Sequence, residues 1–390
     1  MAAWPVFGYG FRPFFLACGA FATIVVPAWM MLYARHQALW PNLPTQLWHA
    51  HEMLYGFAAA AIAGFLLTAV PSWTGIRGFA GRPLVALSLT WCAARVLIAI
   101  GPGSSWWLAI PVELAFLPGL ALLIGPPIVR ERNRNMIMLA VLAALWIADA
   151  TWLYAISTLD LALASRALLV TLDIVLLLVT IIGGRIVPSF TANALRRAGQ
   201  GVDLRSYPLV ERVLPPLMMA NVLADALVPG SRVVAAVAAA AAVLQAWRLS
   251  GWRSLRTRGE PILWVLHVGY AWLPLGFALK AWALAGGATI AQFWQHAFGI
   301  GAVATMILAV MTRAALGHSG RPLTVARGIA WAYGLLSLSA LARVLLPHLG
   351  WLDYATSLLV AALLWTAAFT LFVAYYGPIL TTPRIDGKPG

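Results

Sequence analysis

Two histidines and a glutamate stand at the start of an apolar segment, in the stretch WHAHEMLYGF at residues 48–57. Imidazole nitrogens are good ligands for haem iron, copper and zinc, and a glutamate can act as a proton donor. Residues two apart on a helix point about 200° apart, whereas residues three or four apart share a face. If the helix begins at Trp48, His49 therefore pairs with Glu52 and His51 with Tyr55, and the histidines serve two sites, or one site and its surroundings. If the helix begins later, both histidines can converge on one metal.

The elements that must position these residues are membrane-spanning helices. The chain has 390 residues, of which 62% are hydrophobic and 10% are charged, and its mean hydropathy is +0.86. Soluble domains have roughly 45–50% apolar and about 25% charged residues. Apolar stretches of about 20 residues cross a bilayer as helices, because a helix satisfies its own backbone hydrogen bonds. We therefore predict an all-α polytopic integral membrane protein whose first apolar run, residues 14–33, is retained as a span.

Apolar runs bounded by Gly, Pro and Arg predict about twelve spans within a single transmembrane domain over residues 1–390. They lie near residues 12–34, 45–70, 82–101, 105–130, 134–157, 163–187, 210–229, 232–248, 260–286, 288–316, 322–346 and 350–376. Arginines concentrate in the loops that follow even-numbered spans. By the positive-inside rule, these loops, both termini and an Arg-rich connector at about 188–209 face the cytoplasm. The WHAHE motif then lies at the outer, periplasm-like end of its span.

The formal charge of +14 follows from these loops, so we predict no nucleic-acid partner. The two cysteines stand alone in apolar runs, which argues against a disulfide framework, a c-type haem and an iron–sulfur cluster.

Ionisable groups inside a bilayer are costly, so each is a candidate for function. At about 1.5 Å per residue, His51 and His296 both lie roughly 9–10 Å outside the middle of their spans. His49, His51, Glu52 and His296 can therefore share a level and form a metal site, with Tyr55 supplying protons or electrons. Lys280 falls in about the same layer and is a candidate for cofactor binding, with Asp149 and Arg95 a little nearer the centre. The alternatives are a polar cap at headgroup level and, for Tyr55, plain packing.

A second candidate site lies nearer the cytoplasmic side. His267 falls roughly 9 Å inside the middle of its span, at about 1.5 Å per residue. At that depth it does not share a metal with His296 unless the span boundaries are displaced by two turns, in which case the two sites are one. Three arginines in apolar contexts lie at the depth where haem propionates would meet them: Arg12, Arg185 and Arg313. The competing interpretations are a helix-to-helix hydrogen bond for His267 and snorkelling anchors for the arginines.

Five stretches together resemble the NnrS family: FGYGFRPFFLACGAF (7–21), WHAHEMLYGFAAAAIAGFLLTAVPSWTG (48–75), GGRIVPSFTAN (183–193), LHVGYAWLPLGF (266–277) and HAFGIGAVATMILAVMTRAALGHSGRPL (296–323). The resemblance implies a twelve-span bacterial inner-membrane protein that carries haem and copper and is associated with nitric oxide metabolism and nitrosative stress. We expect haem b and copper, with iron as the alternative to copper. The resemblance also draws attention to His318, whose predicted cytoplasmic position favours a loop role.

The most concrete function that this implies is reduction of nitric oxide to nitrous oxide at a His-ligated metal, with Glu52 as proton donor, Tyr55 assisting and an unknown electron donor. A membrane transporter or metal-handling protein also fits about twelve spans with buried polar residues. A nitric oxide sensor or scavenger without turnover would need the same ligands.

Overall fold

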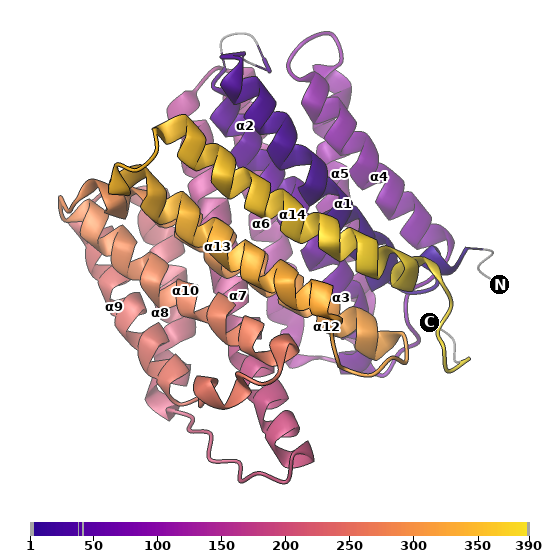
Figure 1. Ribbon diagram of the computed structural model, residues 1–390. Coiled ribbons are helices and arrows are strands. Elements are labelled where there is room, and N and C mark those ends of the chain that lie inside the picture. Colours follow the sequence, from indigo (N-terminus) through magenta and orange to yellow (C-terminus); the bar gives the residue numbers. More distant parts are fainter. Residues whose placement is uncertain (1–3, 38, 41–42, 388–390) are drawn as a thin grey trace. The chain divides into compact units, whose positions relative to one another are not determined.

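The computed structural model describes residues 4–37, 39–40 and 43–387, and these form helices and connecting segments without a β-strand. The elements follow one another along the chain as Figure 1 shows. In the first half they are η1 (Pro5–Phe7), α1 (Phe11–Ala34), α2 (Thr45–His51), η2 (Glu52–Ala58), α3 (Ala59–Thr74), α4 (Arg82–Ile100), α5 (Trp106–Arg130), η3 (Arg134–Met136), α6 (Ile137–Ser157) and α7 (Leu161–Arg197). In the second half they are α8 (Pro208–Leu227), α9 (Arg232–Ser250), η4 (Ser254–Thr257), α10 (Pro261–Leu284), η5 (Thr289–Phe293), α11 (Trp294–His296), η6 (Ala297–Ala304), α12 (Thr305–His318), α13 (Arg327–Leu349) and α14 (Tyr354–Thr381).

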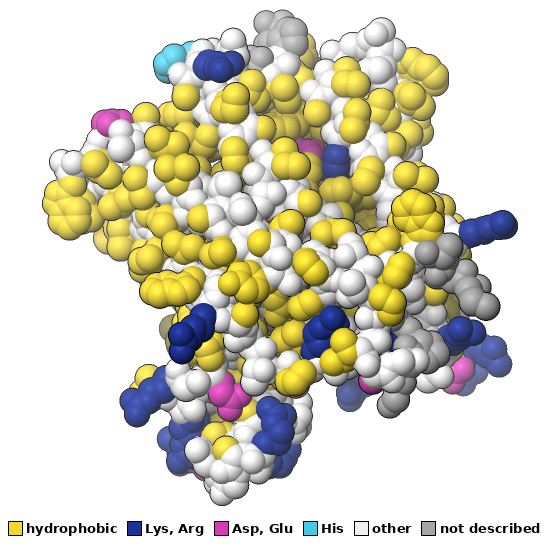
Figure 2. Space-filling view, turned by 45° about the vertical axis from the view of Figure 1, so that its right-hand side comes forward, with side chains coloured by type: hydrophobic (Ala, Val, Ile, Leu, Met, Phe, Trp, Pro, Cys, Tyr) yellow, Lys and Arg dark blue, Asp and Glu magenta, His cyan; other side chains and the backbone are white. Residues whose placement is uncertain are grey.

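Within the described residues, eleven helical segments are long and apolar enough to cross a membrane. This confirms the predicted all-α polytopic membrane fold. The predicted span near 210–229 is present as the 20-residue helix α8, but it is not among the eleven. Its sequence carries Glu211, Arg212 and Asp225, which lower its hydropathy. Figure 2 shows hydrophobic side chains spread widely over the face in view, with many of the visible Lys and Arg side chains in the lower part of the picture. The cytoplasmic location of both termini stays a prediction.

The chain divides into two compact units. Unit 1 comprises Met1–Thr171, Met311–Leu323 and Phe369–Gly390, and unit 2 comprises Leu172–Val310 and Thr324–Ala368. The single transmembrane domain over residues 1–390 stays a prediction.

Small residues set the close helix packing inside unit 1. A Cβ atom added at Gly10 would lie 2.3 Å from the Cβ of Leu67, and one added at Gly64 would lie 2.6 Å from the Phe15 ring. Helices α1 and α3 therefore approach more closely than two larger side chains would permit, as is common for helices packed in lipid.

In unit 2, glycines also allow close packing between α10 and η6. A Cβ atom at Gly276 would lie 2.5 Å from the ring of Phe298, and one at Gly301 would lie 2.3 Å from Trp272. Each glycine accepts an aromatic ring from the opposite element, so the two elements pack by large-against-small contacts.

The basic connector is shorter than the sequence predicts. The sequence predicts a span that ends at residue 187 and a connector over 188–209, but α7 continues through Pro188 to Arg197. An interior proline removes one backbone donor and crowds the carbonyl four residues earlier, but membrane-spanning helices tolerate it when neighbouring groups satisfy the freed carbonyl. The segment between α7 and α8 is therefore residues 198–207, where Asp203 forms ion pairs of 2.9 Å with both Arg253 and Arg256.

Candidate metal centre in unit 1

The WHAHE motif sits where an α-helix widens into a π-helix. Helix α2 ends at His51, and residues Glu52–Ala58 form the π-helix η2 before α3 begins. Gly56 makes this turn compatible with its neighbours, because a Cβ atom there would lie 2.4 Å from the Phe21 ring. The indole nitrogen of Trp91 donates to the Gly56 carbonyl at 3.1 Å. π-Helical turns are rare and occur often at functional sites, so this local geometry favours a functional role for the motif.

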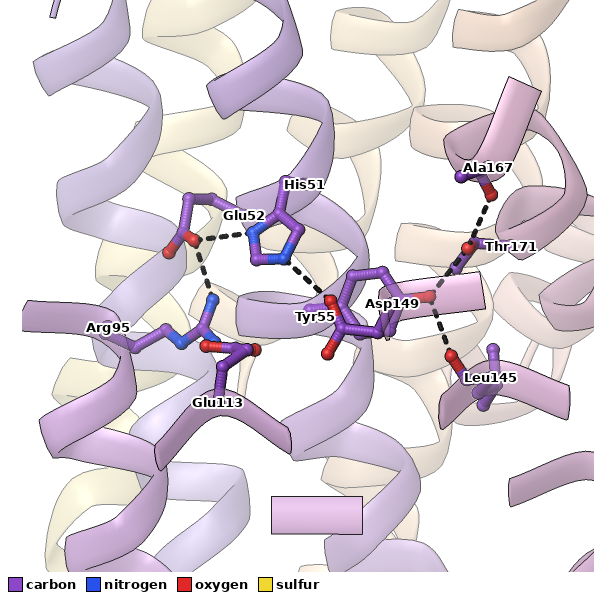
Figure 3. A network of polar contacts seen from close by, with 9 residues as sticks. All are labelled: His51, Glu52, Tyr55, Arg95, Glu113, Leu145, Asp149, Ala167 and Thr171. Atoms are coloured by element: carbon purple, nitrogen blue, oxygen red, sulfur yellow. Dashed lines mark hydrogen bonds and ion pairs between the residues drawn. The ribbon is translucent and has the colours of Figure 1, made fainter. Parts of the chain in front are cut away.

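The imidazole of His51 is completely buried, and each of its two nitrogens has a carboxyl partner (Figure 3). Its Nδ1 lies 3.0 Å from Oε1 of Glu52, and its Nε2 lies 3.1 Å from Oδ1 of Asp149 on α6. The ring stacks on Trp152 with centroids 3.8 Å apart and on Tyr55 with centroids 5.0 Å apart. The side chain is therefore held in one orientation, with a carboxyl group at each nitrogen.

Arg95 of α4 joins this histidine to a third carboxyl group. Its Nη1 donates to Oε1 of Glu52 at 2.7 Å, and its Nη2 donates to both carboxyl oxygens of Glu113 on α5. The exposed fractions are 6% for Arg95, 1% for Glu52 and 3% for Glu113. Charge-assisted hydrogen bonds of this kind are stronger than neutral ones, and an arginine fork fixes geometry as well as charge. Residues from α2, η2, α4, α5 and α6 thus form one connected polar network.

Three members of the network are arranged as metal ligands. One ligand atom each from His51, Glu113 and Asp149 lie within 4.8 Å of one another. One imidazole nitrogen and two carboxylate oxygens suit divalent iron, zinc or manganese, and the set lacks the thiolate or thioether that favours monovalent copper. Glu52 at the other nitrogen of His51 corresponds to the carboxylate that commonly orients a metal-bound histidine.

The charge of the network is compatible with a bound cation. Three carboxyl groups, those of Glu52, Glu113 and Asp149, face one guanidinium group, that of Arg95. With the carboxyl groups ionised and His51 neutral, the network carries two net negative charges. Uncompensated buried charge is strongly unfavourable, and one divalent cation would neutralise it.

Tyr55 packs beside His51, but its hydroxyl group faces other partners. It donates to the Leu145 carbonyl at 2.9 Å and lies 2.7 Å from Oγ1 of Thr171 (Figure 3). Thr171 in turn donates to the Ala167 carbonyl at 2.8 Å. The ring of Tyr55 thus supports the imidazole, while its hydroxyl group anchors η2 to α6 and α7.

The other predicted outer ligands, His49 and His296, have different contacts from those of His51. His49 stacks on Trp29 with centroids 4.4 Å apart, on a different side of the helix from His51. This is the arrangement expected for two residues two apart on a helix that begins before His49. His296 belongs to unit 2, where it lies beside Phe293 with ring centroids 6.4 Å apart. Their roles as metal ligands stay predictions.

The predicted inner site is divided between the two units. His267 lies in unit 2, where its Nε2 is 2.9 Å from Oγ1 of Thr191 and its Nδ1 is 2.9 Å from Oγ of Ser254. Arg185 belongs to the same unit and is exposed. Because both ring nitrogens of His267 have hydroxyl partners, ligation of haem iron there would require one of these bonds to break.

The two remaining predicted arginines, Arg12 and Arg313, belong to unit 1. Nη1 of Arg12 lies 3.2 Å from the carbonyls of Ile379 and Leu380 and 2.6 Å from that of Thr382. It thereby caps the last turn of α14, whose final carbonyls have no partner within the helix. Lys280, the other predicted cofactor-binding residue, contacts two buried aspartates in unit 2.

His318 closes α12 in unit 1. Its ring stacks on Tyr9 with centroids 5.7 Å apart, and its carbonyl accepts a 2.8 Å hydrogen bond from Arg384. These contacts place His318 in the packing of the chain ends.

Sequence reasoning missed Glu113 and did not select Arg95 or Asp149 as site residues. Each is a charged residue in the apolar interior of its helix, without a motif around it. The available signal was the cost of an ionisable group inside a span, which applies to all three. No spacing rule connects residues on three different helices, so only the folded chain reveals that they converge.

Comparison with known proteins bears out the resemblance found in the sequence. The family model described as NnrS protein matches residues 5–384. No curated protein matches the chain.

Proposed function

The chain belongs to the NnrS family, and from this premise we propose that it acts on nitric oxide at a metal ion held by His51, Glu113 and Asp149. The family is linked in general to nitric oxide and to haem and metal proteins. The observation that carries the proposal is the convergence of three buried ligand atoms within 4.8 Å. A buried site inside a multi-pass membrane protein suits nitric oxide, a small neutral molecule that partitions into lipid.

The donor set supports iron at this position better than copper. Two carboxylates and an imidazole are hard and intermediate ligands, which suit divalent iron. A copper ion in the same place is the alternative, and it would need the same three residues. When bound, the metal would provide a place for nitric oxide and a route for electrons.

A haem b at His267 is a separate proposal that the local geometry supports less well. The hydroxyl groups of Thr191 and Ser254 occupy both nitrogens of the imidazole. Arg185, in the same unit, stays the proposed partner for a propionate.

The chemistry that we propose is reductive coupling, in which two nitric oxide molecules, two protons and two electrons give one nitrous oxide and one water. The electrons come from a donor outside this chain. The chain itself excludes water from the ligand atoms, since His51, Glu113 and Asp149 are 0%, 3% and 2% exposed. Trp152 and Tyr55 fix the plane of the imidazole, and Arg95 fixes the carboxyl groups of Glu52 and Glu113.

The contacts of Glu52 favour a positioning role over the proton donation that its place in the motif predicts. Its Oε1 accepts a hydrogen bond from Arg95 and faces Nδ1 of His51. Two such contacts stabilise the ionised carboxylate. We propose that Glu52 holds the Nδ1 proton of His51 and thereby directs the lone pair of Nε2 toward the metal.

The proposed location is the bacterial inner membrane, with both termini in the cytoplasm. The multi-pass helices and the family support a membrane protein of bacteria. The basic loops between the spans give the proposed orientation.

The deciding experiment measures bound metal and nitric oxide consumption in the detergent-purified full-length protein. We expect about one equivalent of iron or copper, which His51→Ala and Asp149→Asn remove while His36→Ala, an exposed control, retains it. Steady nitric oxide loss with a reductant and formation of nitrous oxide would support turnover. Loss that stops at one equivalent would indicate a sensor or scavenger. A metal-free protein that consumes no nitric oxide, after expression with iron and copper supplied, would overturn the proposal.

A further inference from the structure

A second buried polar cluster lies in unit 2, formed by three helices that the proposed metal site does not use. Helix α7 contributes Asp173, α8 contributes Asn221 and Asp225, and α10 contributes Lys280. Asn221 and Asp225 are four residues apart and so share one face of α8. The four residues are at most 2% exposed, so water is excluded from all of them.

The ammonium group of Lys280 is the centre of this cluster. Its Nζ lies 3.4 Å from Oδ1 of Asp173 and 3.2 Å from Oδ1 of Asn221, and it also contacts Oδ2 of Asp225. The ring of Trp294 lies below it, with 5.0 Å between Nζ and the ring centroid. Three oxygens and an aromatic face thus replace the water that an ammonium group would otherwise bind.

The charges of the cluster do not balance when all groups are ionised. One ammonium group faces two carboxyl groups, and Asn221 and Trp294, which complete its surroundings, are neutral. A single buried salt bridge barely repays its desolvation, and an additional carboxylate without a cation of its own is strongly unfavourable. One proton on the carboxyl pair makes the cluster neutral.

The contacts of Asp173 point to the same proton. Its Oδ2 is buried and accepts no hydrogen bond from any N–H or O–H group among the described residues. Its Oδ1 and Oδ2 of Asp225 both contact Nζ of Lys280, so the two carboxyl groups meet at one ammonium group. Two carboxylates that share one site repel each other, which favours protonation of one of them.

We propose that Asp173, Asp225 and Lys280 form a proton-binding centre in which the two carboxyl groups hold one exchangeable proton. A neutral aspartic acid and an aspartate–ammonium pair then coexist, and the proton belongs to the pair of carboxyl groups jointly. This gives unit 2 a group that can take up and release a proton away from bulk water, as in the carboxyl relays of membrane pumps and transporters. The proposal depends on unit 2 alone and does not rest on the metal site in unit 1.

Infrared spectroscopy of the full-length protein in lipid tests the proposal directly. A protonated carboxyl group has a C=O stretch that a carboxylate lacks, and exchange into D₂O shifts it. We expect such a band in the wild-type protein and its loss in both Asp173→Asn and Asp225→Asn, because each variant leaves one carboxylate to pair with Lys280. Asp353→Asn, which changes an exposed carboxyl group, should leave the band intact.

A variant of Lys280 tests the same proton in the opposite direction. Lys280→Met removes the cation, so both carboxyl groups should then be protonated and the band should strengthen. A wild-type spectrum without a band that depends on Asp173 and Asp225 would overturn the proposal, because both groups would be ionised in a fixed ion cluster. A band that D₂O does not shift would also overturn it, since the proton would not exchange. Metal content should be unchanged in all these variants.

Discussion

The rings of His51 and Trp152 are stacked, with centroids 3.8 Å apart and an interplanar angle of 18°. This contact closes one face of an imidazole whose two nitrogens already face Glu52 and Asp149. The side chain is therefore oriented before any metal binds. A ligand fixed in this way loses little freedom on binding, which increases metal affinity.

Replacing Trp152 should weaken the site by loosening His51. We expect Trp152→Leu to lower metal affinity by about 10–100-fold, the range found for residues that support metal ligands. Trp152→Phe keeps an aromatic face and should retain most of the affinity. Competition with a chelator measures the metal affinity of both variants. The control is Trp107→Leu, at a tryptophan that is 74% exposed. Equal affinity in Trp152→Leu and wild type would show that stacking does not orient the ligand.

Removing Arg95 should destabilise unit 1 by leaving buried carboxyl groups without their partner. We expect Arg95→Met to cost about 3–5 kcal/mol, as for other buried ion pairs that lose one member. The double variant Arg95→Met with Glu113→Gln removes one of the stranded charges and should recover part of this loss. Thermal unfolding of the metal-free protein in one detergent measures the difference. A double variant less stable than Arg95→Met would contradict the charge argument.

The Glu52→Gln variant distinguishes a role of Glu52 in positioning His51 from a role as proton donor. If Glu52 orients His51, metal affinity should fall by about 10–100-fold. Excess metal should then restore nitric oxide consumption to nearly the wild-type rate. Rates should be compared at equal metal occupancy, confirmed by metal analysis. A large loss of turnover at full occupancy would assign the proton-donor role to Glu52 instead.

The π-helix predicts a clear difference between two glycines. Gly56→Ala places a Cβ atom 2.4 Å from the Phe21 ring, whereas Gly299, in the other π-helix, has no atom within 4 Å of such a Cβ. We expect Gly56→Ala to destabilise the protein by about 1–3 kcal/mol, the usual cost of overpacking. Gly299→Ala should be nearly neutral. Phe21→Leu combined with Gly56→Ala should recover stability in thermal unfolding if the ring contact is the cause.

Hydropathy predicted most of the fold, because a span of about 20 apolar residues has only one low-energy backbone structure in lipid. It was less informative where charge and proline interrupt the pattern. Helix α7 extends ten residues beyond its predicted end at 187, since neither Pro188 nor the arginines after it break the helix. Helix α8 forms with too many charged residues to count as an apolar span.

Only part of the candidate site could be predicted from the sequence. His51 and Glu52 attract notice because they are adjacent in a motif. Glu113 and Asp149 reach His51 from two other helices, and their positions depend on how those helices pack. Asp173 and Asp225 escaped notice for the same reason, although both are ionisable residues in apolar helices.

Because a π-helix follows His51, the direction of the His51 side chain depends on the number of residues in the segment Glu52–Ala58. Each residue of an α-helix turns the chain by about 100°. A π-turn holds one extra residue without lengthening the span by a full turn. Deleting one residue within Glu52–Ala58 would therefore convert the segment to a regular α-helix and rotate His51 away from Asp149, with every ligand still encoded. An insertion or deletion in this segment should therefore disrupt the site more than most substitutions would.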